Sequence, residues 1–170
     1  DRFSIFEGFL LGFIITAVII VITGLHHSDA LADLADGLMV KGSFEFKHKV
    51  MSDPRNGTAG TVVLIFYIIG MIILVTSIDD KSKLISVIII AEVLSRYSMV
   101  LQCYLGKSAW KGMNSRFIKE MKNKKKFLIS NLILLVSLIT FGFNFYYMVA
   151  CLITMLSSSI ILLLIANRSF

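Results

Sequence analysis

The chain alternates long apolar segments with shorter polar connections. Five segments are apolar and long enough, or nearly long enough, to cross a bilayer as helices of about 20 residues. They are Phe3–Leu25, Ala59–Ile78, Leu84–Leu105, Phe127–Gly142 and Tyr146–Ala166. The fourth is short and needs neighbouring residues or local thinning of the bilayer to span it. The pattern predicts an all-α, polytopic helical membrane protein with about five transmembrane helices.

The longest polar connection begins with a predicted amphipathic helix over Ser28–Leu38. At about 100° per residue, Asp29, Asp33 and Asp36 fall within an arc of roughly 60° on this helix. Three leucines line the opposite face: Leu31, Leu34 and Leu38. The spacing therefore predicts a short acidic helix at the membrane edge, with one apolar stripe for a partner and one stripe of carboxylates.

The three stacked carboxylates indicate a bound cation, because like charges at these helical spacings repel each other. Carboxylate oxygens suit hard cations such as Mg²⁺, which bind few side chains and often take phosphate oxygens as further ligands. Asp29 and Asp36 lie about 10 Å apart along the helix axis. Asp33 lies between them and is placed to bridge two ions about 4 Å apart. The alternative is a surface helix whose aspartates face water.

A second motif follows at Met51–Gly60. Lys41–Lys49 is polar and predicts another short surface helix, and Pro54 with Asn56-Gly57 marks a tight turn before the second span. The backbone amides at Gly57, the Thr58 hydroxyl and Arg55 are expected to face an anion near the helix N-terminus. Asp53 is a candidate fourth metal ligand. The alternative is an ordinary loop that enters a helix.

The remaining spans carry few polar residues. Glu92 and Arg96 sit at the middle of the third span with i, i+4 spacing, and such residues usually face a bundle interior or a wet cavity. They predict either a buried structural ion pair or a contact of Arg96 with phosphate. Gly8 and Gly12 in the first span predict close packing with another helix. Two cysteines, Cys103 and Cys151, are expected to pack as small apolar residues, without a disulfide or zinc site.

Composition and charge agree with a membrane protein. Of 170 residues, 56% are hydrophobic and one is proline, and this length favours one domain over residues 1–170. Residues 106–126 hold eight basic residues and one acid, a charge of +7 against +6 for the whole chain. The positive-inside rule places this loop and the acidic helix on the cytoplasmic side. Attraction to anionic lipid head groups explains the loop, and steering of a nucleotide is a further possible role. Nucleic-acid binding is not expected.

Two linked motifs carry a family resemblance. The pattern H-x-D-x-x-x-D-x-x-D-G at His27–Gly37 and M-x-D-x-R-x-G-T-x-G at Met51–Gly60 resembles cobalamin-5′-phosphate synthase, also called adenosylcobinamide-GDP ribazoletransferase. Ser95-Arg96 and Gly112-Met113 resemble weaker family features. The strong part of the resemblance lies in Gly24–Gly60.

The resemblance implies an enzyme of the cytoplasmic membrane, with Mg²⁺ as cofactor. It would join adenosylcobinamide-GDP to α-ribazole or α-ribazole 5′-phosphate and release GMP, late in cobalamin biosynthesis. The implied catalytic residues are Asp33, Asp36 and His27. The implied substrate-binding residues are Arg55, Gly57, Thr58 and Arg96. The implied metal ligands are Asp29, Asp33, Asp36 and Asp53.

The chain also departs from the family pattern. Ala30 stands where glycine is common, and Glu7 stands where many members have a proline-containing entry to the first span. The chain begins at Asp1 without a signal peptide, and it stops at Asn167–Phe170, where the family continues with a glycine- and aspartate-rich motif. We therefore expect it to be truncated at both ends relative to the family.

Other functions remain open at this point. A membrane prenyltransferase or a CDP-alcohol phosphotransferase also binds magnesium diphosphate through aspartates, but the D-x-R-x-G-T-x-G turn favours the first family. A cation transporter would carry acids near the midplane of several spans, whereas Glu92 is the clear example here. The oligomeric state is left open.

Overall fold

The computed structural model describes residues 2–78, 80–110, 113–141 and 144–170. Within these ranges the secondary structure is entirely helical, which confirms the predicted all-α class. Contacts divide the chain into two compact units, residues 1–81 and 82–170. Each unit is described by itself. The single membrane domain predicted over 1–170 stays a prediction, and Gly112 of the weaker family feature lies outside the described residues.

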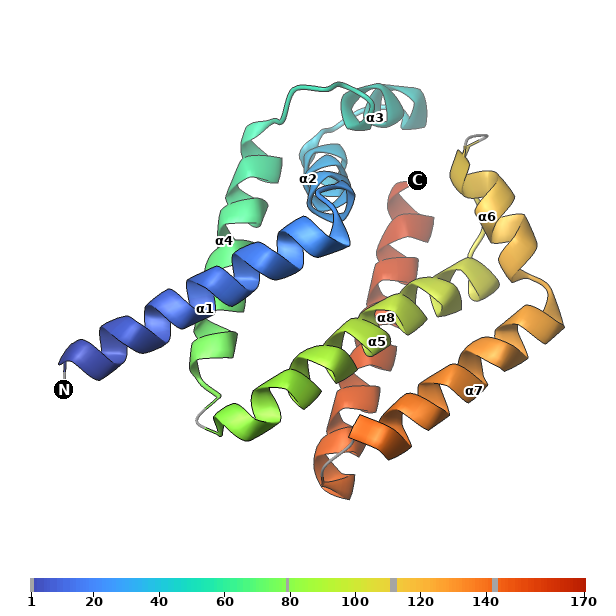
Figure 1. The fold of residues 1–170 in the computed structure, drawn as a ribbon. Helices are drawn as coiled ribbons and strands as arrows, with labels where there is room; N and C mark the ends of the chain where they lie inside the picture. The colour runs from blue at the N-terminus through green and yellow to red at the C-terminus, as the bar shows by residue number, and fades with distance from the viewer. Residues whose placement is uncertain (1, 79, 111–112, 142–143) are drawn as a thin grey trace. The chain divides into compact units, whose positions relative to one another are not determined.

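The first unit contains four helices. They are α1 (Arg2–Thr23), α2 (His26–Met39), α3 (Phe44–Met51) and α4 (Thr58–Thr76). Both predicted surface helices are present as α2 and α3. Gly24 adopts a φ of 81° between α1 and α2, a conformation that glycine takes without a steric penalty. Helices α2 and α3 gather at the end of the unit where α1 finishes and α4 starts (Figure 1).

Helix α1 packs on α4 through small residues, as Gly8 and Gly12 predicted. A Cβ on Gly8 would lie 3.5 Å from the Thr76 methyl carbon. A Cβ on Gly12 would overlap the Thr76 hydroxyl and lie 3.0 Å from the carbonyl oxygen of Ile72. The Thr76 hydroxyl donates a hydrogen bond of 3.4 Å to the Gly8 carbonyl. The two backbones therefore approach closely because neither glycine carries a side chain.

Helix α2 packs on α4 with a different face from the one expected. Its buried residues are Ala32, Asp36 and Gly37, whereas the predicted leucine stripe is only partly buried: Leu31, Leu34 and Leu38. The reason is again close approach, because the α4 residue that meets Ala32 is Gly60. The three aspartates predicted to share one stripe therefore differ in burial, since Asp36 belongs to the packed face.

The second unit contains α5 (Lys81–Leu105), α6 (Met113–Met121), α7 (Lys124–Phe141) and α8 (Phe145–Ser169). Its core is formed by Ile90 and Leu94 of α5 with Met155 of α8, and side chains of α7 pack against them. The Ser98 and Ser159 hydroxyls join α5 and α8 at 2.7 Å. Helix α6 was not predicted, because its charged sequence was interpreted as a loop.

Four of the described helices are long and apolar enough to cross a membrane, namely α1, α4, α5 and α8. The fourth predicted span, Phe127–Gly142, became α7, whose 18 residues begin with three lysines. Its apolar part is the segment that the sequence showed to be short. Many large apolar side chains on the spanning helices are exposed, as expected for surfaces that face lipid. Both cysteines are free thiols; Cys103 is partly buried, whereas Cys151 is exposed rather than packed as expected.

Candidate functional site

The three aspartates of α2 differ in their surroundings. Asp29 is exposed, Asp33 is half-buried, and Asp36 is buried with 9% of its surface exposed. Burial raises the pKa of Asp33, and the negative charges of Asp29 and Asp36 raise it further. The predicted repulsion among the three carboxylates is therefore present, and it contributes to the raised pKa of the middle one, Asp33.

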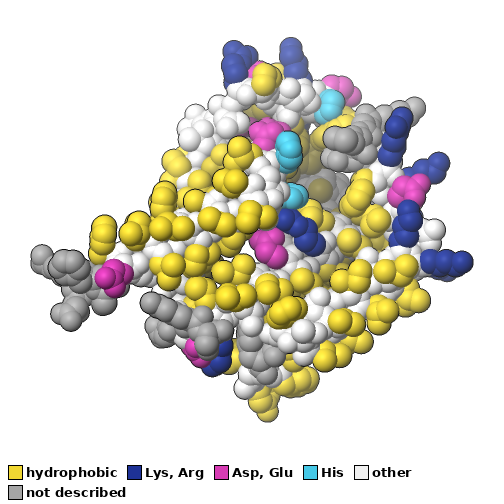
Figure 2. All heavy atoms as spheres, in the orientation of Figure 1, with side chains coloured by type: hydrophobic (Ala, Val, Ile, Leu, Met, Phe, Trp, Pro, Cys, Tyr) yellow, Lys and Arg dark blue, Asp and Glu magenta, His cyan; other side chains and the backbone are white. Residues whose placement is uncertain are grey.

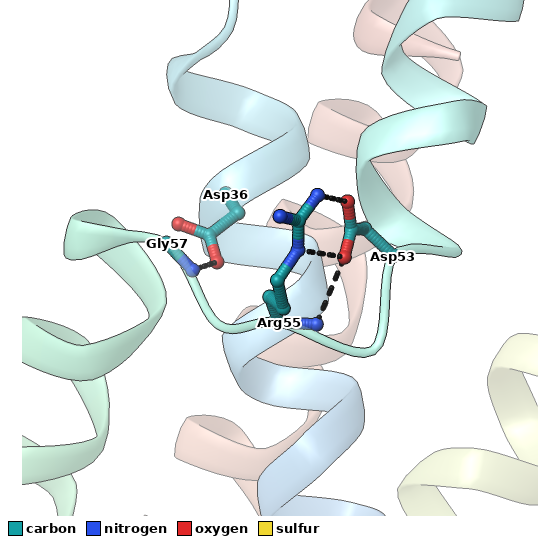
Figure 3. Close-up of polar contacts among 4 residues, drawn as sticks. All are labelled: Asp36, Asp53, Arg55 and Gly57. Atoms are coloured by element: carbon teal, nitrogen blue, oxygen red, sulfur yellow. Dashed lines mark hydrogen bonds and ion pairs between the residues drawn. The ribbon is translucent and has the colours of Figure 1, made fainter.

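Asp36 caps the first turn of α4. Its Oδ2 accepts a hydrogen bond of 2.7 Å from the Gly57 amide, and its Oδ1 accepts one of 2.8 Å from the Gly60 amide (Figure 3 draws the first). Gly57 is the N-cap of α4 and has no side chain to cap the helix. A carboxylate from another helix thus satisfies the N-cap and N3 amides, two positions that a capping box usually satisfies locally. Its charge also faces the positive end of the α4 dipole.

Both amide donors must be glycines for the carboxylate to fit. A Cβ on Gly57 would lie 2.5 Å from Oδ1 of Asp36. A Cβ on Gly60 would lie 2.6 Å from Oδ2 of Asp36 and 2.9 Å from the Ala32 carbonyl oxygen. The glycines of the second motif therefore make room for the third aspartate of the first motif. The Gly57 amide, predicted to face a substrate anion, donates to Asp36 in this structure.

Asp53 and Arg55 form an ion pair within the turn before α4. The Arg55 Nε donates to Oδ1 of Asp53 at 3.0 Å and Nη2 donates to Oδ2 at 2.9 Å, and the Arg55 amide also donates to Oδ1 at 3.0 Å (Figure 3). These bonds lower the pKa of Asp53 to about 2. They also raise the pKa of the Arg55 guanidinium. A predicted metal ligand and a predicted phosphate ligand are therefore bonded to each other.

A cavity of about 810 Å³ lies beside this turn. Its polar lining comes from Asp36, Asp53, Arg55 and Thr58, and its apolar lining includes Met39 and Val62. The described lining residues lie between Ala35 and Val63, so His27, Asp29 and Asp33 fall outside the cavity. His27 lies exposed in the first turn of α2. The structure thus brings Asp36 and the second motif together around one hollow.

Arg96 lies in the second unit, on α5. Its Nη2 is 3.2 Å from Oε2 of Glu92 one turn earlier, so the two residues form an ion pair, but their side chains are 41% and 35% exposed rather than buried. A cavity of about 300 Å³ borders the pair and is lined also by Tyr97 and by Ser130 of α7. The Tyr97 hydroxyl donates to Asn131 at 2.7 Å, which ties α5 to α7 beside this hollow. The contact of Arg96 with a substrate phosphate stays a prediction.

Comparison with known families assigns the chain. The family model described as cobalamin-5-phosphate synthase matches residues 3–170. The chain belongs to the cobalamin-5-phosphate synthase family. This membership agrees with the two motifs at His27–Gly37 and Met51–Gly60, which meet at the Asp36 cap.

Curated relatives in the cobalamin-5-phosphate synthase family carry the name adenosylcobinamide-GDP ribazoletransferase. The protein of Pyrococcus furiosus is 36% identical over 107 residues, 63% of this chain and 45% of that protein. The protein of Vibrio cholerae is 36% identical over 84 residues, 49% of this chain and 32% of that protein. The protein of Pyrococcus abyssi is 35% identical over 105 residues, 61% of this chain and 43% of that protein. The matched part is thus about a third to about half of each relative. No solved structure matches the chain.

Sequence reasoning about the cobalamin-5-phosphate synthase motifs missed one residue of this site. Gly60 was not named as a site residue, although its amide donates a hydrogen bond to Asp36 and a side chain at this position would collide with that carboxylate. The signal was available, since glycine at both the N-cap and N3 positions leaves α4 without a local cap. The structure also holds no group of three or more His, Cys, Asp or Glu side chains placed to bind a metal among its described residues. The four predicted metal ligands do not converge on one point.

Proposed function

We propose that the protein catalyses transfer from adenosylcobinamide-GDP to α-ribazole or α-ribazole 5′-phosphate, with release of GMP. The observation that carries the proposal is the Asp36 cap, which joins the two family motifs beside the 810 Å³ cavity. Family membership and the names of the relatives support it. The reaction class is the displacement of a nucleotide from a diphosphate.

The cavity offers two kinds of surface to such a donor. Its apolar lining from α2 and α4 suits the non-polar parts of a large substrate, and its polar edge at Arg55 and Thr58 suits phosphate. Arg55 is exposed and bonded to Asp53, so a substrate phosphate would compete with that carboxylate for the guanidinium. We propose that Arg55 exchanges Asp53 for phosphate when the donor binds.

We propose Asp29 and Asp33 as the principal Mg²⁺ ligands. Mg²⁺ usually takes one or two carboxylates together with substrate phosphates, and these two carboxylates lie one turn apart on α2. The charges that raise the pKa of Asp33 are those that a cation would offset. Asp36 and Asp53 keep further lone pairs beyond their protein bonds and remain proposed ligands. When bound, Mg²⁺ would neutralise the diphosphate and favour departure of GMP.

The protein residues then have defined tasks in the displacement. A ribose hydroxyl oxygen of the acceptor attacks the phosphorus attached to cobinamide, and the bond from that phosphorus to the GMP oxygen breaks. The hydroxyl proton passes to a carboxylate or imidazole, for which Asp33, Asp36 and His27 are the proposed bases. Asp36 also holds the turn at Gly57, and with it the wall of the cavity, in place.

We propose further that the protein lies in the cytoplasmic membrane with α2, α3 and α6 on the cytoplasmic side. The four candidate spans and the positive charge of residues 106–126 support this topology. Single cysteines at Ser43 and Ser115, in a background without Cys103 and Cys151, should label from the same side with a membrane-impermeant thiol reagent. Labelling from opposite sides would contradict the topology.

The transfer is tested with full-length protein in vesicles. GMP should appear only when adenosylcobinamide-GDP, an α-ribazole acceptor and Mg²⁺ are present together. Release of GMP without acceptor would indicate hydrolysis, and no release under any combination would refute the proposal. The variant Gly70→Ala serves as a control for variant preparation and should keep the activity, because a Cβ at this α4 position would meet nothing within 4 Å.

A further inference from the structure

A basic surface runs along α6 and the first turn of α7. It consists of the exposed side chains of Arg116, Lys119, Lys122, Lys124, Lys125 and Lys126. The one acid among them, Glu120, lies 2.5 Å from the ammonium of Lys126. Six positive charges and one negative charge leave +5 on this surface. Figure 2 shows these basic side chains along one edge of the second unit, with one acidic side chain among them.

Helix α6 also has an apolar side next to its charges. At about 100° per residue, Phe117, Ile118 and Met121 fall on one side, while Arg116 and Lys119 fall on the other. Phe117 is 51% exposed. A helix with basic residues on one face and an exposed aromatic residue on the other is typical of segments that lie in the plane of a membrane interface.

The start of α7 is electrostatically unfavourable by itself. Lys124, Lys125 and Lys126 occupy its first turn, where the helix dipole is positive and acidic residues are preferred. Asn123 caps the turn by accepting a hydrogen bond of 2.9 Å from the Lys125 amide, but it brings no negative charge. Glu120 compensates Lys126 alone. The first turn of α7 therefore carries more positive charge than Glu120 offsets.

Aromatic residues mark the level of the membrane interface at this end of the second unit. Tyr104 near the end of α5 stacks on Phe127 of α7, with ring centroids 4.0 Å apart. Trp110 packs edge-on against Phe170 at the end of the chain, with centroids 6.2 Å apart. Tyrosine and tryptophan concentrate at the head-group level of membrane proteins. Helix α6 follows Trp110 and precedes Phe127, so it belongs to this level.

We propose that the basic surface binds the head groups of anionic phospholipids, with Phe117 inserted among the lipid chains beneath them. A phospholipid supplies both the anion that the first turn of α7 requires and the apolar surroundings that Phe117 requires. A soluble polyanion such as a nucleotide would match the charges and leave Phe117 in water. The Coulombic attraction adds up over the lysines, as it does for other basic segments beside a membrane.

The test uses Trp110, the only tryptophan of the chain, as a local probe. The protein is placed in vesicles that contain phosphatidylcholine and a minority of phosphatidylglycerol. In one sample the phosphatidylglycerol carries bromine, which quenches tryptophan, and in the other an equal amount of phosphatidylcholine carries it. We expect brominated phosphatidylglycerol to quench Trp110 about twofold more strongly. The difference should disappear near 1 M salt, where the Debye length falls to about 3 Å.

Two variants, each with three positive charges removed, distinguish the effect of this surface from the effect of the net charge of the protein. Lys122→Gln, Lys124→Gln and Lys125→Gln together should abolish the preference for phosphatidylglycerol. The matched control replaces three lysines of the first unit by glutamine: Lys41, Lys47 and Lys49. It should keep the preference.

Equal quenching by both lipids in the unmodified protein would overturn the proposal, and this measurement requires no variant to fold. A saturable change of Trp110 emission on addition of GDP in purely neutral vesicles, without any preference for anionic lipid, would also overturn the proposal. That result would assign the surface to a nucleotide.

Discussion

Replacing Gly60 by alanine tests whether the Asp36 cap holds α2 on α4. The new Cβ would lie 2.6 Å from Oδ2 of Asp36, 2.9 Å from the Ala32 carbonyl oxygen and 3.0 Å from the Ala32 Cβ. Two of these three atoms belong to Ala32 on a rigid helix, so the methyl group cannot be accommodated by a side-chain rotation alone. Either α2 moves away from α4 or the carboxylate leaves the amides.

The cost follows from two terms. Overpacking of this kind costs about 1–3 kcal/mol. Loss of a hydrogen bond to a charged group adds about 1.5–3 kcal/mol. The better helix propensity of alanine returns about 1 kcal/mol. We therefore expect Gly60→Ala to lower the free energy of unfolding by about 1.5–5 kcal/mol.

The matched control is Gly70→Ala in the same helix. A Cβ at Gly70 meets nothing within 4 Å, so this variant retains the propensity gain without the collision. Unfolding of both variants is followed by circular dichroism during titration with a denaturing detergent. Equal stability of the two variants would refute the account of the cap, because the variants differ in what the added methyl group meets.

Three further outcomes follow from the site. Asp33→Asn should lower Mg²⁺-dependent turnover more than Asp29→Asn, because Asp33 lies between the other two carboxylates; equal, mild losses would indicate a single ion or a solvated stripe. Arg55→Met should raise the pKa of Asp53 from about 2 towards its ordinary value of 3.8 in an NMR titration. The Asp53–Arg55 pair stabilises the turn fully at pH values above the ordinary pKa of Asp53, and this stabilisation is lost as the pH falls through about 2. The variant lacks the pair and should show no such loss of stability near this pH. Gly12→Ala should weaken the packing of α1 on α4 by about 1–3 kcal/mol in the same detergent titration, and an unchanged stability would contradict the close approach.

The sequence predicts the helices well because apolar length determines them. The predicted second span, Ala59–Ile78, became Thr58–Thr76, and the predicted fifth, Tyr146–Ala166, became Phe145–Ser169. Helix α6 escaped prediction because it is only nine residues long and lies in the strongly basic stretch 106–126, although Phe117 and Met121 have helical spacing. Hydrophobicity fixes a span, but it is a weak guide to a short interfacial helix.

The sequence predicts which residues form the site better than it predicts the hydrogen bonds and ion pairs between them. A helical wheel treats Asp36 as the equal of Asp29, because the wheel contains no information about the two glycines of α4 that receive its carboxylate. The Met51–Gly60 motif likewise assigns Asp53 to a metal and Arg55 to a phosphate. In the structure, Asp53 and Arg55 carry opposite charges two residues apart and form an ion pair with each other. A tertiary neighbour decides the pairing of Asp36, and a single sequence does not list it, whereas the Asp53–Arg55 pair is local.

The Asp36 cap also bears on how the protein is made. Asp36 precedes Gly57 by 21 residues, so it leaves the ribosome first, yet it bonds to amides that appear only when the second span is synthesised. Until α2 docks, those first-turn amides lack their protein partner and are left to water at the membrane edge. The first turn of α4 therefore depends on a helix that is made before it, and a change at Asp36 would loosen α2 and the start of α4 together.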